Sequence, residues 1–169
     1  MRLTSFLVRE AIIPELSVRG NGIDPKNPQQ VLEVKTRVIR EMAQALHAAG
    51  YFRADELDDI VKAVIRREQL GTTGIGQGIA IPHSRHSSVH ELVGTLALAP
   101  EGLPFDSLDN EPVYVIFLLV SPQERPGDHL RALEAIVRTM RDADFVKRLR
   151  ACKSREEIWN LLESAAPGW

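Results

Sequence analysis

The sequence has a single cysteine, few aromatic residues and almost no excess of charge. One cysteine, Cys152, excludes an internal disulfide framework and fits a reducing compartment, so we expect a cytoplasmic protein. A formal net charge of −2 disfavours a dedicated nucleic-acid binder, which normally carries a basic excess. Aromatic residues, at 5%, are also too sparse for a platform on which bases stack. We therefore expect no nucleic-acid partner.

Long apolar runs are absent as well. No uncharged apolar run approaches the roughly 20 residues that span a bilayer, so we expect no direct membrane insertion. Arg9 and Glu10 interrupt the apolar start MRLTSFLVREAIIPEL, which gives no signal-peptide core. Hydrophobic residues make up 44% and charged residues 26%, which is typical of a globular chain. A length of 169 residues fits one domain with a substantial core, and we predict that residues 1–169 form a single domain.

The pattern of apolar residues predicts two helices before residue 72. The first helix begins at Asn27-Pro28, where asparagine caps it and proline takes the first helical position, and it runs to Gly50. The second helix begins near Asp55 and ends at Gly71. Both show apolar residues at helical spacing. The residues expected to face the core are Val31, Val34, Val38, Met42, Leu46 and Ala49, then Leu57, Ile60, Val61, Val64 and Ile65.

Strands and further helices follow. The runs LVGTLALA from Leu92 and VYVIFLLV from Val113 have the length and β-branching of buried strands. A third helix after SPQERPGDHL should turn Leu130, Leu133, Ile136, Val137 and Met140 inward. Ser154 and Glu157 form a capping box that opens a last helix. This order predicts an α/β (α+β) sandwich, in which a short mixed β-sheet is flanked by helices.

Residues 74–90, GIGQGIAIPHSRHSSVH, hold three of the five histidines. The glycines allow positive φ and a close backbone approach. Pro82 cannot donate to a sheet ladder, so the apolar strand IAI should end there and a loop should follow. His83 would then stand at a strand end, where a side chain is both held and open to solvent.

A metal site is one interpretation of this segment. His83, His86 and His90 follow an H-x2-H-x3-H pattern, which shares one face only on a helix. Pro82 and the nearby serines favour a loop, and Gly94 stands where the metalloprotease pattern H-E-x-x-H needs its second histidine. No cysteine or carboxylate cluster supplies further ligands. We therefore expect no metal, with His86 and His90 as solvated loop residues.

A nucleotide site and acyl-transfer chemistry are two further interpretations of residues 74–90. The turn GIGQG follows a helix instead of a strand, and it lacks the G-K-[ST] lysine of a phosphate-binding loop. No G-x-S-x-G elbow occurs anywhere in the chain. We expect no cofactor, and the glycines would contact a phosphoryl group only through their backbone N–H groups.

A single reactive histidine is the interpretation that a family resemblance favours. The segment REQLGTTGIGQGIAIPHSR closely resembles the motif of fructose/mannitol-type IIA domains of the bacterial sugar phosphotransferase system, nearest to the nitrogen-regulatory IIA branch. The segments FDSLDNEPVYVIFLLVSP and GDHLRALEAIV match the family's second strand block and the helix that follows it. The resemblance spans about Leu3 to Leu162 and implies the fructose/mannitol-type IIA fold. Two departures are Ser84, where glycine is usual, and Gln77, where asparagine or an acidic residue is commoner.

The resemblance implies a role for four side chains. His83 matches the family's phosphoryl acceptor, and a neutral imidazole is a competent nucleophile near pH 7. His129, near the start of the third helix, would lie beside His83 and hydrogen-bond the phosphoryl oxygens. Arg67 would supply positive charge or be a solvated charge, and Thr73 would donate to the phosphate or support the turn.

The predicted function is that of a phosphocarrier. His83 would accept a phosphoryl group from an HPr-type phosphohistidine carrier and pass it to a IIB partner, or use it as a signal to a regulatory target. The chain would thus be a phosphotransferase component with a phosphohistidine intermediate, or act mainly as a regulator. The alternative is a regulatory binding protein that transfers nothing onward and whose affinity depends on His83 phosphorylation. A metal-dependent hydrolase that uses His83, His86 and His90 is the third hypothesis.

Overall fold

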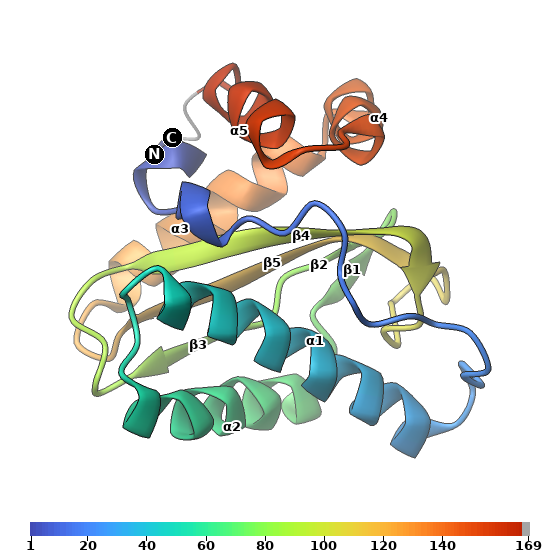
Figure 1. Cartoon of the computed structure of the whole chain (residues 1–169), viewed down its shortest axis with the longest axis horizontal. Coiled ribbons are helices and arrows are strands. Elements are labelled where there is room, and N and C mark those ends of the chain that lie inside the picture. The colour runs from blue at the N-terminus through green and yellow to red at the C-terminus, as the bar shows by residue number, and fades with distance from the viewer. Residues whose placement is uncertain (167–169) are drawn as a thin grey trace.

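The structure, a computed structural model, describes residues 1–166. Within these residues, five α-helices and five strands form three layers, with the sheet in the middle (Figure 1). Helices α1 and α2 cover one face of the sheet, α3, α4 and α5 cover the other, and the N-terminal segment contributes buried residues to both sides. The helices are α1 (Pro28–Ala48), α2 (Ala54–Leu70), α3 (Pro126–Met140), α4 (Ala143–Ala151) and α5 (Arg155–Glu163). The strands are β1 (Gly74–Gly76), β2 (Ile79–Ala80), β3 (His83–His86), β4 (Val93–Leu103) and β5 (Val113–Pro122).

Strand β5 is the centre of the sheet. It pairs antiparallel with β4 on one side and parallel with β2 and then β3 on the other. The first strand, β1, forms a hairpin with β2. The free edge of β4 is covered by the N-terminal segment, whose backbone N–H groups at Val8, Ile13 and Leu16 donate to β4 carbonyls. The predicted mixed sheet between helices is confirmed.

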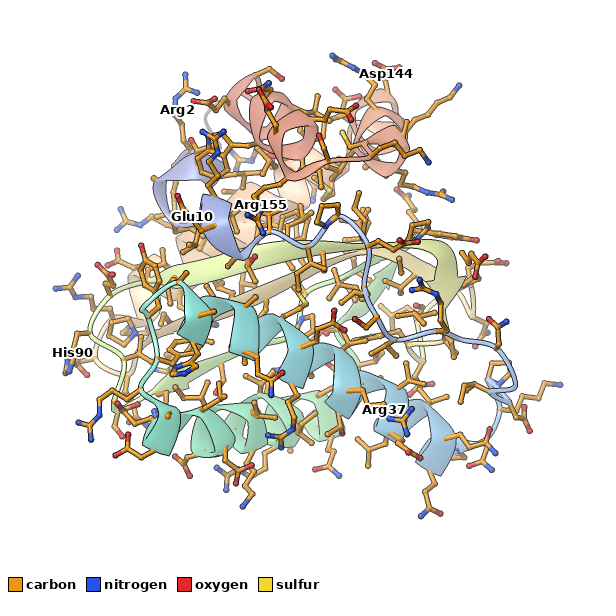
Figure 2. The ribbon with its side chains drawn as sticks, in the orientation of Figure 1. Arg2, Glu10, Arg37, His90, Asp144 and Arg155 are labelled. Carbon is orange, nitrogen blue, oxygen red and sulfur yellow. The ribbon has the colours of Figure 1, made fainter. Side chains whose placement is uncertain are left out.

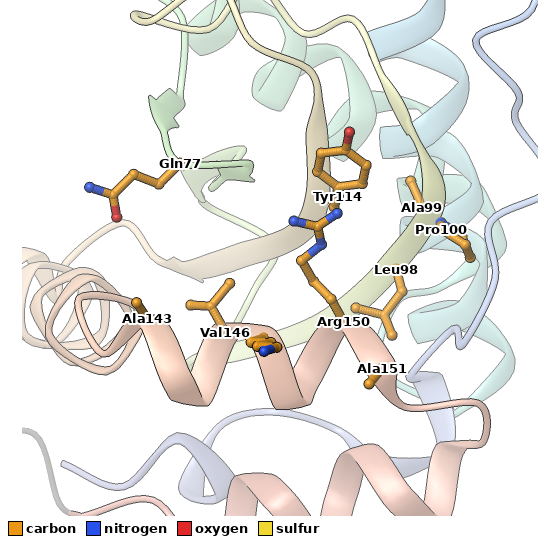
Figure 3. A pocket seen from close by; sticks show the side chains of 10 residues that line it. Gln77, Leu98, Ala99, Pro100, Tyr114, Ala143, Val146, Arg150 and Ala151 are labelled. Atoms are coloured by element: carbon orange, nitrogen blue, oxygen red, sulfur yellow. The ribbon is translucent and has the colours of Figure 1, made fainter.

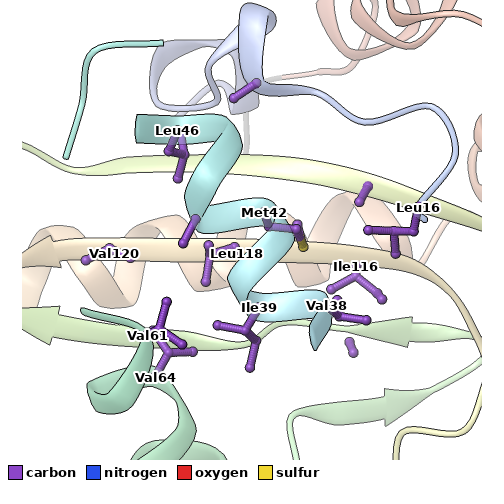
Figure 4. Close-up of a cluster of buried hydrophobic side chains, with 14 of the residues drawn as sticks. Leu16, Val38, Ile39, Met42, Leu46, Val61, Val64, Ile116, Leu118 and Val120 are labelled. Carbon is purple, nitrogen blue, oxygen red and sulfur yellow. The ribbon is translucent and has the colours of Figure 1, made fainter. Parts of the chain in front are cut away.

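Two apolar clusters lie on the two faces of the sheet. In the first, α1 and α2 pack on β5 through side chains such as Met42, Val64 and Leu118 (Figure 4). In the second, α3, α4, α5 and the N-terminal segment pack on the opposite face around Phe117 and Leu119. Because β5 is buried on both faces, its sequence is apolar almost without interruption, which is typical of an interior strand.

The predicted helix ends are largely confirmed. Asn27 Oδ1 accepts the backbone N–H groups of Gln29 and Gln30 at 3.1 and 3.2 Å, with Pro28 at the first helical position. Ser154 Oγ accepts the N–H of Glu157 at 3.1 Å, whose carboxylate returns to the N–H of Lys153 instead of that of Ser154. The capping box therefore forms with its return bond shifted by one residue.

Two predictions about local structure were wrong, and one helix was missed. The segment after Pro82 is strand β3 and not a loop, because the Pro82 carbonyl still accepts the N–H of Leu119 at 3.0 Å and pairing with β5 resumes at His83. Leu130 is 56% exposed, since α3 turns Ala132, Ala135, Ile136 and Met140 toward the sheet. Helix α4 was not predicted; Asp142 caps it and Phe145, Val146 and Leu149 are its buried residues. No helix in residues 1–166 is both long and apolar enough to cross a membrane.

Candidate functional site

His83 is the first residue of β3, where that strand lies beside β5. Its ring Nδ1 lies 2.7 Å from the carbonyl oxygen of Ile81, and since a carbonyl only accepts, Nδ1 must carry the proton. In the neutral ring the lone pair then sits on Nε2. The side chain is half-buried. The hydrogen bond to the backbone therefore orients a ring whose Nε2 can act as a nucleophile.

His129 comes from the first turns of α3 and meets His83. The two ring centroids are 5.2 Å apart and the ring planes are inclined by 56°. Its Nδ1 lies 2.5 Å from the Oγ of Ser121, which belongs to β5 and is fully buried. The structure therefore brings together the two histidines that the sequence analysis singled out, although they stand 46 positions apart in the chain.

Both imidazoles are held in the neutral form. Burial lowers the pKa of His83, as does the charge of Arg67, while the Ile81 carbonyl opposes the shift. Burial lowers the pKa of His129 to about 4, and the nearby His83, Arg85 and Arg67 act in the same direction. At pH 7 the site thus holds two neutral rings with positive charge beside them.

Two arginines supply that charge. Arg67, in the last turn of α2, donates from Nη1 to the carbonyl of Gly71 at 2.9 Å, and its charge depresses the pKa of both histidines. Arg85 was not singled out from the sequence, yet its charge acts on His129. It stands two residues after His83 in β3, and residues at that spacing share one face of a strand.

Thr73 lies next to a buried ion pair. Its hydroxyl donates to Glu68 Oε1 at 2.6 Å and its N–H donates to Oε2 at 2.9 Å. Lys35 of α1 reaches the same carboxylate at 2.8 Å, and Lys35 and Glu68 are 5% and 3% exposed. Thr73 itself is 4% exposed, so these contacts fix the turn between α2 and β1. The signal in the sequence was a lysine on the apolar stripe of the first helix, between Val31 and Val38.

The two remaining histidines of the segment, His86 and His90, lie in different environments. His86 is not a solvated loop residue: its side chain is 11% exposed, and its Nε2 lies 2.5 Å from Asp59 Oδ2 of α2. Ser88 donates its N–H to Nδ1 at 3.1 Å, so Nε2 is the donor to Asp59. His90 is exposed at the surface (Figure 2). Among residues 1–166, no group of three or more histidine, cysteine, aspartate or glutamate side chains could hold a metal ion.

The glycine turn lies at the other end of the sheet. Gly78 and Gly102, both with φ of +81°, border the ring of Tyr114, because a Cβ at either would come within 3.1 Å of it. The Arg150 guanidinium stacks 3.7 Å from the centroid of that ring, in a groove of about 530 Å³ that Gln77 also lines (Figure 3). Ile79 pairs with Val115 and His83 with Leu119, four residues or about 13 Å along β5. The amides of Gly76 and Gly78 therefore lie beyond hydrogen-bonding reach of His83.

The two departures from the family motif have local roles. Gln77 adopts φ of +58° and donates its N–H to Asp109 Oδ2 at 2.9 Å. Ser84 donates its hydroxyl to the carbonyl of Arg85 at 2.9 Å. Neither contact involves His83.

The fold is that of solved IIA proteins. The crystal structure of nitrogen regulatory protein IIA-Ntr from Neisseria meningitidis superposes with a TM-score of 0.76 at 27% identity, covering 94% of this chain and 97% of that one. The complex of enzyme IIA mannitol with phosphorylated enzyme IIB mannitol from Escherichia coli gives 0.69 at 19% identity, over 92% and 96% of the chains, which shows the fold alone. The fold class predicted from the resemblance is thus confirmed.

Sequence comparison narrows the class. Residues 27–165 match the family model described as phosphoenolpyruvate-dependent sugar phosphotransferase system, EIIA 2. The nitrogen regulatory protein of Bradyrhizobium diazoefficiens is 32% identical over 162 residues, which cover 96% of this chain and 95% of that protein. The chain belongs to the EIIA 2 family of phosphotransferase-system phosphocarrier domains.

Proposed function

We propose that His83 is the phosphoryl acceptor of this IIA domain. The donor is an HPr-type phosphohistidine carrier, and residues 1–169 act as one cytoplasmic domain. The observation that carries the proposal is the paired arrangement of His83 and His129, in which the Ile81 carbonyl leaves the lone pair of His83 on Nε2.

The transfer balances without a change in proton number. The Nε2 lone pair of His83 attacks the phosphorus, a new N–P bond forms, and the N–P bond to the donor imidazole breaks with its electron pair staying on the donor nitrogen. The donor leaves as a neutral imidazole. His83 keeps its proton on Nδ1, where it is hydrogen-bonded to the Ile81 carbonyl. This hydrogen bond stabilises the positive charge of the phosphorylated ring. Since one phosphoramidate replaces another, the group remains available for a second transfer.

Positioning and charge supply the rest of the catalysis. The transition state of phosphoryl transfer is loose and spreads charge over three oxygens, so donors and cations around the acceptor matter more than a base. Arg67 and Arg85 contribute positive charge, and the ring of His129 is in contact with the ring of His83, the acceptor. Thr73 keeps both its donors on Glu68, and its part in the site is to hold the turn that leads to Ile81.

The neutral acceptor also sets a pH range. Because the pKa of His83 is lowered, its Nε2 lone pair persists at pH values where an ordinary histidine would be protonated. Transfer should therefore continue below pH 6.5 before it declines.

The similarity to nitrogen regulatory proteins favours signalling as the outcome of phosphorylation. The added group carries about −1.5 to −2 charges at pH 7, enough to recruit or repel a docked regulatory target. The IIA mannitol complex with phosphorylated IIB supports a IIB protein as an acceptor in the alternative, transport-type role. Discharge of the phosphorylated chain by a purified IIB protein separates the two roles, since a purely regulatory binding protein would keep its label.

Incubation with phosphorylated carrier tests the acceptor directly. We expect an acid-labile, alkali-stable label on the intact chain and none on His83→Ala. His90→Ala is the matched control, because it removes an exposed histidine of the same segment and should label normally. Label that persists on His83→Ala would remove His83 from the proposal.

The partner ring is tested by rate. His129→Ala should fold normally and still accept label on His83, but about 100-fold more slowly, the loss seen when one preorganised donor is deleted. An unchanged transfer rate would exclude His129 from the site.

A further inference from the structure

Ser121 is the polar end of an otherwise apolar strand. It follows residues 113–120, VYVIFLLV, in which Tyr114 alone has a polar group, and it is fully buried. A hydroxyl taken out of water is costly unless it finds a hydrogen bond. Its Oγ lies 2.5 Å from His129 Nδ1. The buried hydroxyl is therefore matched to one nitrogen of the second ring in the candidate site.

The two rings of the site have chemically different Nδ1 partners. At His83 the partner is a carbonyl, which only accepts, so the proton is on Nδ1 and Nε2 is bare. At His129 the partner is a hydroxyl, which can also donate. When Ser121 donates its O–H to Nδ1, the single proton of the neutral His129 ring moves to Nε2. The two histidines then hold opposite tautomers, one suited to attack and one suited to donate.

We propose that Ser121 is a positioning residue that sets the Nε2–H tautomer of His129 and so makes this ring a hydrogen-bond donor to a phosphoryl group on His83. The inference rests on the proposed acceptor role of His83. In the opposite tautomer a bare Nε2 would face the phosphoryl oxygens and repel them. The low pKa of His129 supports the argument, because a neutral ring has only one N–H to place.

A serine suits this place better than a fixed acceptor would. A phosphoryl dianion beside His129 favours the imidazolium, in which both ring nitrogens carry protons. The Ser121 hydroxyl can then rotate and accept from Nδ1–H, so the contact survives in both protonation states. A carbonyl or carboxylate in its place would hold the proton on Nδ1 and leave Nε2 of the neutral ring bare.

The tautomer can be observed directly by NMR of protein labelled with ¹⁵N-histidine, because protonated and bare ring nitrogens have well-separated shifts. In the wild-type protein at pH 7 we expect Nε2 of His129 to be the protonated nitrogen. Ser121→Ala should mix the two tautomers and slow phosphoryl transfer from the carrier roughly tenfold, the share expected of one lost hydrogen bond. Ser121→Thr keeps a hydroxyl and should restore both the tautomer and the rate.

Thr95→Ala is the matched control. Thr95 is a fully buried hydroxyl of the neighbouring strand β4, and it donates to the carbonyl of Ala11 at 2.7 Å. Its removal should lower stability in the same way as Ser121→Ala, while the His129 tautomer and the transfer rate stay unchanged.

The outcomes separate the two proposals. A wild-type His129 with its proton on Nδ1, or a Ser121→Ala variant with unaltered tautomer and rate, overturns the role of Ser121 even when His83 accepts label. A wild-type chain that takes no label on His83 overturns the proposed function instead. If Ser121→Ala fails to fold, the wild-type tautomer and the Ser121→Thr rate still decide the question.

Discussion

Lys35 and Glu68 form a buried ion pair that joins α1 to α2 behind the site. The Glu68 carboxylate also accepts the hydroxyl and the N–H of Thr73, so all of its charge is compensated inside the protein. Removing one member of a buried pair leaves the other as an unpaired charge in a poorly solvated place. At the scale of single residues, we therefore expect this pair to be sensitive to substitution.

Lys35→Met should lower the free energy of unfolding by about 3–5 kcal/mol, because the Glu68 carboxylate loses its cation. Urea unfolding measures this loss. Arg37→Met is the matched control on the same helix, since its ion pair with Glu33 is mostly exposed and should be worth less than about 1 kcal/mol. Equal losses for the two variants would show that the buried pair has no special weight.

His129 gives a stability that depends on pH. Its pKa is about 4 in the folded protein and near 6.5 when unfolded, so between these values the unfolded chain binds more protons. Stability should therefore fall as pH drops from 6.5 toward 4. His129→Gln should flatten that part of the profile, measured by urea unfolding at pH 7, 6, 5 and 4. A variant with the same acid slope as the wild type would contradict the shift.

The candidate site was predicted from the sequence only in part, for physical reasons. His83 and His129 were found because a long motif carries them, and the structure places their rings in contact. Arg85 and Ser121 were missed, because their relation to the site depends on the parallel pairing of β3 with β5, where Arg85 stands opposite Ser121. No spacing within one segment reveals a neighbour that another strand supplies. The acceptor, donor and charge roles stay predictions.

At the scale of elements, strand β3 depends on a side-chain contact outside the sheet. It has four residues and, within residues 1–166, pairs only with β5, while α2 packs against it. The hydrogen bond between His86 and Asp59 links the end of β3 to α2. The first residue of the same strand is His83.

His86→Ala should loosen β3 without unfolding the protein. We expect a stability loss of about 1 kcal/mol, at the low end for a hydrogen bond to a charged group because Asp59 is largely exposed. Amide hydrogen exchange should quicken in residues 83–86 and leave β4 unaffected. His90→Ala, in the same segment but exposed, should change neither. Equal protection of β3 in both variants would show that this side-chain contact is unnecessary.

Element prediction succeeded where a segment carries its own pattern. Helices α1 and α2 and strands β4 and β5 have clear apolar periodicity or long apolar runs, and all four formed close to their expected ranges. The segment at Pro82 was misjudged because proline removes one donor but leaves its carbonyl free to pair. Helix α4 is short and polar on most of its surface, so its three buried residues gave little signal.

At the scale of the whole molecule, the N-terminal segment belongs to the fold, although the family match begins at residue 27. It runs along the free edge of β4 and contributes buried side chains to both apolar clusters. Its buried apolar residues are Leu3, Phe6, Leu7, Val8, Ala11, Ile12 and Leu16. At about 1.5–3 kcal/mol for each large apolar side chain, their burial is worth about 10 kcal/mol or more.

A chain that lacks residues 1–16 should therefore lose its cooperative thermal transition, because that loss approaches the whole stability of an ordinary domain, about 5–15 kcal/mol. Circular dichroism during heating measures it. The full chain carrying Arg9→Ser and Glu10→Ser is the control, since both side chains are exposed and its transition should remain. A sharp transition in the shortened chain would show that the segment is dispensable.

Within residues 1–166, the start of the chain contacts the end of α5. Arg2 Nη1 donates to the carbonyl of Glu163 at 3.3 Å, and Figure 1 shows the first residues and α5 on the same side of the sheet. A short glycine linker could therefore join them, and new ends could be opened in the exposed turn 108–111 between β4 and β5. Such a circular permutant should fold with an unchanged far-ultraviolet spectrum and still take phosphoryl label at position 83. A permutant that stays unfolded would mean that the order of assembly, and not only the final contacts, depends on where the polypeptide starts.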